Sequence, residues 1–144
     1  MTDYSPSAVA VAAESFDAMI LTRTVWGEAR GEPHAGKLAV AYVVINRFKS
    51  GKWFAGKTVA STCMKAQQFS CWNAGDAKRE KMCDATLADL DESQAAALAA
   101  VLGTQGDPTE GCTHYHYVGI SPPWASGKQP HVTIGRHSFY KEID

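Results

Sequence analysis

The chain has 144 residues, of which 45% are hydrophobic and 20% charged, and its formal net charge is -1. This length suits one domain with its own core, and this composition excludes an intrinsically disordered chain. The near-zero charge excludes the broad basic surface on which nucleic-acid binding depends, so we expect no nucleic-acid partner.

The N-terminal segment 1–14 is expected to be a loose leader or a weak first helix, ahead of a catalytic core over residues 15–144. Asp3 and Glu14 break the pattern of a secretory signal, and no stretch approaches the roughly 20 apolar residues that cross a bilayer. We therefore expect one domain over 1–144 that is made in a cytoplasm without a signal peptide, does not insert into membranes and is monomeric.

Two helices are predicted in the first third of the chain. Apolar residues recur at helical spacing from Ser15 to about Ala29, and Gly31 is expected to end this helix. A second helix is predicted to start near Pro33, which is acceptable at a first helical position. Residues 35–49 are apolar on nearly all sides, which is typical of a helix at the centre of a core.

The remaining helices are shorter, except for the last. The pattern predicts helices over 58–64, 78–83 and 91–102, the last of them closed by Gly103. The segment 67–75 between the first two is interpreted as a loop or a short extended segment.

The C-terminal third changes character. Residues 113–118 and 132–134 have strand-forming side chains, and a proline-rich loop around residues 122–124 separates them. A short β hairpin is therefore predicted here. The fold class is α+β, mostly α, with this small hairpin in the C-terminal third.

The four cysteines have spacings that match no C-x-x-C metal or redox motif. They are Cys63, Cys71, Cys83 and Cys112. If the protein stays in a reducing compartment, we expect these cysteines to be free or buried thiols. A Cys63–Cys71 or Cys71–Cys83 disulfide is the alternative outside one.

Glu28 is the first candidate for chemistry. It follows an apolar stretch that ends at Trp26, and partial desolvation at such a place disfavours the charged form of a carboxyl, as a general acid requires. Gly27 and Gly31 are expected to leave open space around it for a bulky substrate.

Glu32 lies four residues later and would share a helix face with Glu28. The structural interpretation is that both carboxylates pair with Arg30, His34 or Lys37 at a helix end.

Glycosidic cleavage needs an acid and a group that stabilises a positive anomeric centre. Nothing in the sequence distinguishes among the candidates for the second carboxylate, which are Glu32, Asp76, Asp84, Asp89 and Glu110. A single acid suffices if the acetamido group or the 6-hydroxyl of the substrate reacts, and Glu28 would then act first as acid and afterwards as base.

Several aromatic and polar residues suit a sugar-binding cleft, because sugar rings present apolar C–H faces and polar rims. They are Gln68, Phe69, Ser70, Trp72, His114, Tyr115, Tyr117 and Trp124. Packing is the alternative for each aromatic residue taken alone. Asn46 interrupts the apolar central helix, and because a buried amide must be hydrogen-bonded, it is expected to brace the loop that holds Glu28 or to line the cleft.

The cysteine and histidines of the C-terminal third are candidate ligands for zinc. The residues concerned are Cys112, His114, His116 and His137. Their spacing is not that of a helical zinc pair and no second ligand pair accompanies them, so we expect no metal and no other cofactor. Nucleophilic Cys–His catalysis is disfavoured because no cysteine lies in a glycine-rich nucleophile context.

Six segments resemble, in the same order, the SleB/CwlJ-type cell-wall hydrolase family of spore cortex-lytic enzymes, which is also met in bacteriophage and prophage genes. They are residues 21–33 (LTRTVWGEARGEP), 36–47 (GKLAVAYVVINR), 68–72 (QFSCW), 107–115 (DPTEGCTHY), 123–125 (PWA) and 134–140 (IGRHSFY). The resemblance covers roughly residues 20–140. Cys112 departs from the family, which more often has a small residue such as alanine there.

The resemblance implies a lysozyme-like fold related to lytic transglycosylases. It implies cleavage of peptidoglycan between N-acetylmuramic acid and N-acetylglucosamine, by a lytic transglycosylase or muramidase with Glu28 as the catalytic residue. The expected substrate-binding residues are Glu32, Asn46, Gln68, Phe69, Ser70, His114, Tyr115 and Trp124.

The absence of an export signal and of binding repeats favours a phage or prophage lysin released through a holin. Two alternatives remain open: a non-catalytic wall-binding or virion structural module, and a zinc amidase or peptidase.

Overall fold

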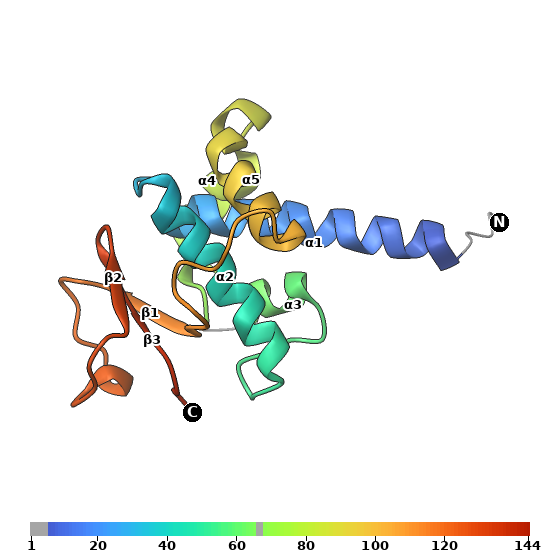
Figure 1. Cartoon of the computed structure of the whole chain (residues 1–144). Helices are drawn as coiled ribbons and strands as arrows, with labels where there is room; N and C mark the ends of the chain where they lie inside the picture. Colours follow the sequence, from blue (N-terminus) through green and yellow to red (C-terminus); the bar gives the residue numbers. More distant parts are fainter. Residues whose placement is uncertain (1–5, 66–67) are drawn as a thin grey trace.

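The computed structural model describes residues 6–65 and 68–144, and most of the described chain is helical (Figure 1). The helices are α1 (Pro6–Ala29), α2 (His34–Ser50), α3 (Val59–Met64), α4 (Ala77–Asp84) and α5 (Leu87–Leu102), with 3-10 helices η1 (Ser70–Trp72) and η2 (Pro123–Ala125). The strands are β1 (His114–Tyr117), β2 (Val132–Ile134) and β3 (His137–Tyr140).

Helix α1 begins at Pro6, earlier than the sequence predicts. Of the two alternatives for the N-terminal segment, a loose leader or a weak first helix, the structure shows helix for residues 6–14, which are the first turns of α1. Residues 1–5 lie outside the described residues. A proline is compatible with a first helical turn because its missing N–H has no intrahelical partner there. The predicted end at Ala29 is confirmed.

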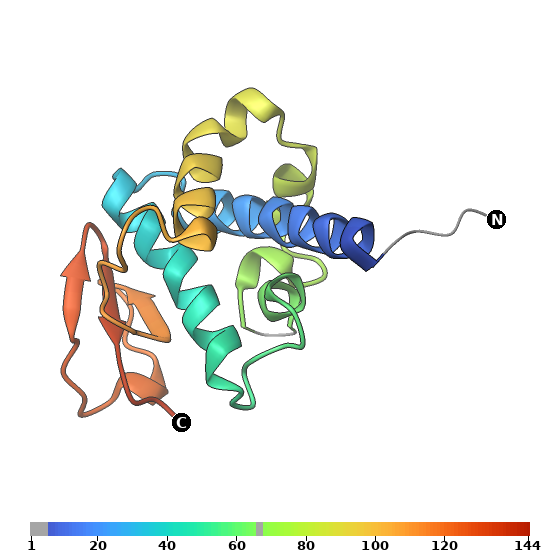
Figure 2. The same ribbon diagram turned by 45° about the vertical axis from the view of Figure 1, so that its right-hand side comes forward.

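Helix α2 is the central helix, as predicted. It lies between the sheet on one side and α1 with α5 on the other (Figure 2). Residues 38–45 are buried except Tyr42, which is half-buried, so side chains all around the helix contact other elements. Gly51 ends α2 with a left-handed φ of 65°, a conformation that glycine adopts without strain.

Helix α5 starts at Leu87 and not at the predicted Asp91. The Thr86 hydroxyl accepts from the backbone N–H of Asp89, and the Asp89 carboxylate accepts from the backbone N–H of Thr86. This capping box satisfies two backbone donors at the helix start, which stabilises the additional turn. Gly103 closes the helix as predicted.

The sheet has three antiparallel strands in the order β1-β3-β2. The two predicted strands are present, but they do not pair with each other, because both pair with β3, which the sequence did not indicate. A two-residue turn connects β2 to β3 through Gly135, whose φ of 59° suits the first turn residue of a type II′ hairpin. All four residues of β3 are buried, so no alternation of apolar and polar residues marked it.

The two faces of the sheet have different neighbours. Tyr115 and its cross-strand partner Phe139 face the helices and join the hydrophobic core. His114, His116 and Tyr140 point to the opposite, outer face, because successive strand residues alternate in direction. The described part of the chain contains no helix whose length and hydropathy would let it cross a membrane.

Candidate active site

Glu28 lies in the last turn of α1, where α1, η1 and β1 meet. Its carboxyl is half-buried, and the Tyr115 hydroxyl of β1 donates to Glu28 Oε1 at 2.9 Å. The side chain of Cys71, from η1, also lowers the pKa of this carboxyl. Residues that are distant in sequence thus converge on one acidic group.

Burial raises the pKa of Glu28 above its ordinary value of 4.5. The hydrogen bond from Tyr115 and the charges of Lys78 and Arg47 act in the opposite direction without cancelling this effect. A carboxyl whose proton is retained to higher pH is suited to act as a general acid.

The glycine beside Glu28 permits close packing and leaves no open space, contrary to the sequence-based expectation. A Cβ on Gly27 would lie 2.8 Å from Cys71 Cβ and 3.2 Å from Met82 Sδ. A Cβ on Gly31 would lie 2.8 Å from an Arg136 guanidinium nitrogen. The two distances of 2.8 Å are too short for a real Cβ contact. Gly27 therefore lets η1 approach α1 closely, whereas at Gly31 the neighbour is only the tip of the exposed Arg136 side chain, which could move.

Arg47, on α2, is a buried cation near Glu28. Its side chain is only 5% exposed and stacks on two rings, with its guanidinium carbon 4.7 Å from the Phe69 centroid and 5.7 Å from that of Phe54. Its Nε donates to the Thr113 carbonyl oxygen at 2.6 Å, and its Nη1 donates to Gln68 Oε1 at 3.3 Å.

Gln68 and Phe69 therefore both contact the guanidinium group of Arg47 in this structure. Phe69 is 1% exposed, so its ring offers no face to a sugar, and the expectation of a cleft residue is corrected to a core residue. Gln68 is half-buried and its carbonyl oxygen holds the guanidinium. Ser70 is exposed at the start of η1, and its role in substrate binding stays a prediction.

Asn46 braces a loop, although not the loop expected. Its Nδ2 donates to Asp107 Oδ2 at 2.8 Å and to the Cys112 carbonyl oxygen at 2.9 Å. It thus holds the segment that leads into β1, while Glu28 belongs to a helix. The neighbouring Arg47 binds the next carbonyl, that of Thr113, so two consecutive α2 residues fix the start of β1.

Asp107 organises the same loop. Its Oδ1 accepts from the Thr109 backbone N–H at 2.8 Å and from the Thr109 hydroxyl at 2.7 Å. Its Oδ2 accepts from Asn46 and, at 2.9 Å, from the Gly111 backbone N–H. One carboxylate thereby satisfies four donors and sets the path of the chain toward Tyr115.

Glu32 anchors the β2–β3 turn, which corrects the expected role in substrate binding. Its side chain is 4% exposed; Oε1 accepts from the Arg136 backbone N–H at 2.7 Å, and Oε2 accepts from Arg136 Nε at 3.0 Å. His137 Nδ1 lies 3.5 Å from Oε1. The partner of the Glu32 carboxylate is thus a residue from the far end of the chain, while Lys37, one of the three expected partners, donates to the Glu32 backbone carbonyl.

Burial alone would raise the pKa of Glu32, but the hydrogen bonds from Arg136 and the nearby His137 lower it below 4.5. A lowered pKa means that ionised Glu32 stabilises the fold above its unfolded pKa, and that this stability is lost as the pH falls through the folded pKa. Glu32→Gln is expected to cost about 1–3 kcal/mol at neutral pH and to lose less stability on acidification than the wild type. Thermal unfolding at a series of pH values, with the exposed Glu80→Gln as control, checks this; equal slopes would contradict it.

His114 belongs to the outer face of the sheet, opposite to Tyr115. It is 6% exposed, its ring packs at 4.8 Å from that of Phe54 and 5.2 Å from that of Trp124, and burial lowers its pKa to about 4. The expectation that His114 and Tyr115 line one cleft together is therefore corrected, because adjacent strand residues point to opposite faces.

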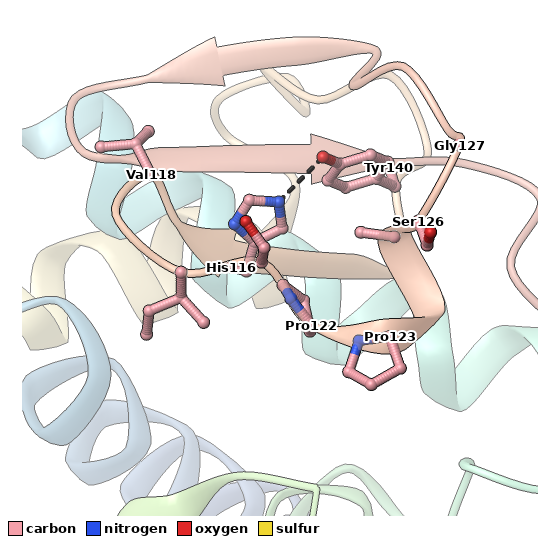
Figure 3. A pocket seen from close by; sticks show the side chains of 10 residues that line it. His116, Val118, Pro122, Pro123, Ser126, Gly127 and Tyr140 are labelled. Atoms are coloured by element: carbon pink, nitrogen blue, oxygen red, sulfur yellow. Dashed lines mark hydrogen bonds between the residues drawn. The ribbon is translucent and has the colours of Figure 1, made fainter.

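Trp124 is half-buried over the same outer face, where its ring lies 5.1 Å from that of Tyr140. Beside it is a hollow of about 460 Å³ (Figure 3). Within the hollow, His116 Nε2 and the Tyr140 hydroxyl are 2.8 Å apart, and Val118 and Pro122 line its wall. Contact of Trp124 with substrate stays a prediction, on the face away from Tyr115.

A family model described as Cell Wall Hydrolase matches residues 31–140. The chain belongs to this family. The match begins just after Glu28, so the role of Glu28 depends on the geometry above and on the resemblance of residues 21–33.

Two curated relatives are spore cortex-lytic enzymes. That of Bacillus subtilis (strain 168) is 29% identical over 124 residues, which covers 85% of the chain and 37% of the enzyme. That of Bacillus cereus is 29% identical over 130 residues, which covers 87% of the chain and 44% of the enzyme. The chain therefore spans less than half the length of these relatives.

Two solved structures share the fold of this family member. The catalytic domain of the Bacillus cereus SleB protein has a TM-score of 0.71 at 25% identity, covering 98% of the chain and 94% of that domain. The catalytic domain of the germination-specific lytic transglycosylase SleB from Bacillus anthracis has a TM-score of 0.70 at 25% identity, covering 98% and 99%. The expected lysozyme-like, mostly helical fold and the SleB-type resemblance are confirmed.

The residues weighed for zinc do not gather into one ligand set. Within residues 6–65 and 68–144, no three His, Cys, Asp or Glu side chains are placed to hold a metal ion. His116 contacts Tyr140, His137 lies near Glu32, and the Cys112 thiol donates to the Thr109 carbonyl oxygen. All four cysteines of this family member are free thiols in the structure.

Three residues of the site were missed as participants from sequence. Arg47 and Asp107 occur in the sequence only as members of segments that resemble the family, and Cys71 only as one of four cysteines. A usable signal existed for Arg47, because a charged residue on a helix that is apolar all round must find buried partners.

Proposed function

We propose that the chain degrades peptidoglycan by cleaving the glycan strand between N-acetylmuramic acid and N-acetylglucosamine. The observation that carries this proposal is the half-buried Glu28 carboxyl, whose pKa is raised by burial while the Tyr115 hydroxyl holds Oε1 at 2.9 Å. The family membership and the spore cortex-lytic relatives support the substrate class.

The mechanism we propose uses Glu28 twice. Protonated Glu28 donates its proton to the glycosidic oxygen as the bond from that oxygen to the anomeric carbon breaks. The resulting carboxylate then takes a proton from the attacking hydroxyl. That hydroxyl is the 6-hydroxyl of the same muramoyl residue in a transglycosylase, which closes a 1,6-anhydro ring, or water in a muramidase.

The surroundings of Glu28 support a single catalytic carboxyl. Among the described residues, the largest influences on the pKa of Glu28 include no other carboxylate. The other candidates for a second carboxylate have structural partners: Glu32 binds Arg136, Asp76 caps α4, Asp89 caps α5, and Glu110 pairs with His131. Asp84 is exposed at the end of α4. The acetamido group or the 6-hydroxyl of the substrate therefore takes the second role in our proposal.

Mass spectrometry of the soluble products from purified sacculi tests the proposal and decides the reaction type. We expect disaccharide muropeptides with 1,6-anhydromuramoyl ends, as the transglycosylase name of one structural relative suggests. Reducing muramoyl ends would instead indicate a muramidase. Products cleaved only in the peptide stem would contradict a glycosidase and favour an amidase or peptidase.

A role in host cell lysis is a second, separate part of the proposal, and it comes from the resemblance to enzymes of phage and prophage genes. If the chain is a lysin that reaches the wall after release from the cytoplasm, co-expression with a holin should lyse bacteria. Expression alone, and co-expression of the Glu28→Gln variant with the holin, should not. Lysis by the variant would contradict it.

A further inference from the structure

We propose that Tyr115 is a positioning residue that orients the Glu28 carboxyl, and that Tyr115 and the buried Arg47 stabilise the ionised form of this carboxyl between the two proton transfers. This inference depends on the proposed function for its meaning, and it reassigns Tyr115 from substrate contact to control of the acid. It also gives a role to a buried cation that sequence patterns left unexplained.

Tyr115 fixes one oxygen of the carboxyl. Its hydroxyl donates to Glu28 Oε1, which leaves Oε2 to carry the proton toward the substrate. The tyrosine ring is itself held by edge contacts, with centroids 5.0 Å from His137 and 5.6 Å from Phe139. A donor on a packed ring defines the direction of the Oε1 lone pair, and therefore the orientation of the whole carboxyl.

Arg47 is a buried charge without a direct ion pair. None of the ion pairs among residues 6–65 and 68–144 includes it, although its side chain is only 5% exposed. Burying an unpaired cation is costly, and protein interiors rarely retain one without a compensating role. Glu28 is the carboxyl whose charge interacts with Arg47, together with the ionisable Tyr115 and Cys63.

The reaction cycle explains why such a cation is useful. After the first proton transfer, Glu28 is a carboxylate that is largely removed from water. If no nearby group stabilised this charge, the carboxylate would take its proton back from the leaving group. The guanidinium of Arg47 and the Tyr115 hydroxyl stabilise that carboxylate until the attacking hydroxyl supplies the second proton. Because Arg47 also binds the Thr113 carbonyl, the cation and the start of the strand that carries Tyr115 are fixed as one unit.

Four groups from four elements act on the charge of Glu28: Tyr115 of β1, Arg47 of α2, Cys71 of η1 and Lys78 of α4. Lys78 is exposed, so solvent screens it, and the Cys71 thiol is a weak donor. Lys78 stands ahead of Arg47 among the charges that lower the pKa of Glu28. Because its side chain is exposed and screened by solvent, we take Tyr115 and the buried Arg47 as the influences that are held in fixed positions.

The experiment titrates Glu28 directly, by NMR of carboxyl carbons in labelled protein, with Glu28→Gln used to assign the signal. Tyr115→Phe should raise the pKa of Glu28, because the donor that favours the carboxylate is lost. The alkaline limb of the activity profile should then move to higher pH. Sacculus-cleaving activity near neutral pH should nevertheless fall about tenfold to a hundredfold, because the Glu28 carboxyl is no longer held in one orientation. Lys81→Gln, an exposed α4 cation that is not among the groups acting on Glu28, is the matched control.

Arg47→Met and Arg47→Lys separate charge from shape. Methionine keeps most of the apolar stem between the phenylalanine rings and removes the charge, so it should raise the pKa of Glu28, whereas lysine keeps the charge and should leave the titration near that of the wild type. If Arg47→Met does not fold, as judged by its thermal melt, Arg47→Gln takes its place. An unchanged pKa of Glu28 in the folded neutral variant would contradict the role of Arg47.

An unchanged pKa of Glu28 in folded Tyr115→Phe overturns the proposal. Loss of activity without a shift of the pH profile would do the same, because it would indicate a merely structural role. The titration requires no turnover, so its outcome is distinguishable from a failure of the proposed glycosidase function.

Discussion

Replacing Glu28 by glutamine is expected to reduce the release of soluble muropeptides from sacculi by at least about 10³-fold, within the range that general acid–base groups contribute. Glutamine has nearly the same shape and its carbonyl oxygen can still accept from Tyr115, but it can neither donate the first proton nor accept the second. The fold should tolerate the change, because it removes a carboxyl that burial already disfavours in its charged form.

The measurement compares muropeptide release with thermal unfolding of the same protein. Glu80→Gln is the matched control, because Glu80 is exposed on α4 and the substitution makes the same chemical change away from the site. We expect wild-type activity and unfolding temperature from the control. Activity of Glu28→Gln within tenfold of the wild type would refute the assignment of Glu28.

Asp107→Ala is expected to have the largest effect on stability among exchanges of half-buried polar residues, a loss of about 3 kcal/mol or more. It removes the acceptor of four hydrogen bonds, and each donor left without a partner in a protein interior costs about 1–3 kcal/mol, less where water reaches it. The loop into β1 would then lose one of its two hydrogen bonds from Asn46 and keep the one to the Cys112 carbonyl oxygen. We therefore expect activity to fall together with stability.

Urea unfolding followed by fluorescence measures this loss. Asp91→Ala, an exposed position on α5, is the control and should change the free energy of unfolding by no more than about 0.5 kcal/mol. Asp107→Asn should also be destabilised, because an amide nitrogen would face the donors from Asn46 or Thr109. A loss below about 1 kcal/mol for Asp107→Ala would show that the loop is held by other contacts.

Local signals in the sequence predicted much of the helical structure. The segment 35–49, which is apolar on nearly all sides, and the Gly51 that follows it correspond to α2, because a helix at the centre of the core buries residues on every side. The start of α5 was placed too late because the capping box of Thr86 and Asp89 lies ahead of the apolar run. Strand β3 was not predicted, because all its residues are buried and it therefore lacks the period-two alternation of a half-exposed strand.

The interpretation of the glycines was wrong for a reason that sequence cannot supply. A glycine shows only that a side chain is missing, and does not tell whether solvent or another element occupies the space. At Gly27 the space is occupied by Cys71 and Met82, and at Gly31 by Arg136. The same holds for Glu32, whose partner Arg136 lies 104 positions away along the chain.

Glu28 could be selected from the sequence by itself, because its position after an apolar helical stretch and the resemblance of residues 21–33 are both local properties of the chain. Most of the helices and the fold class could also be predicted from local properties of the sequence. Only the tertiary structure decided what surrounds Glu28. Tyr115 lies 87 positions from it, and Arg47 and Cys71 reach it from separate elements. Contacts between distant segments depend on how α1, α2 and the sheet pack, and no periodicity within a segment records that packing.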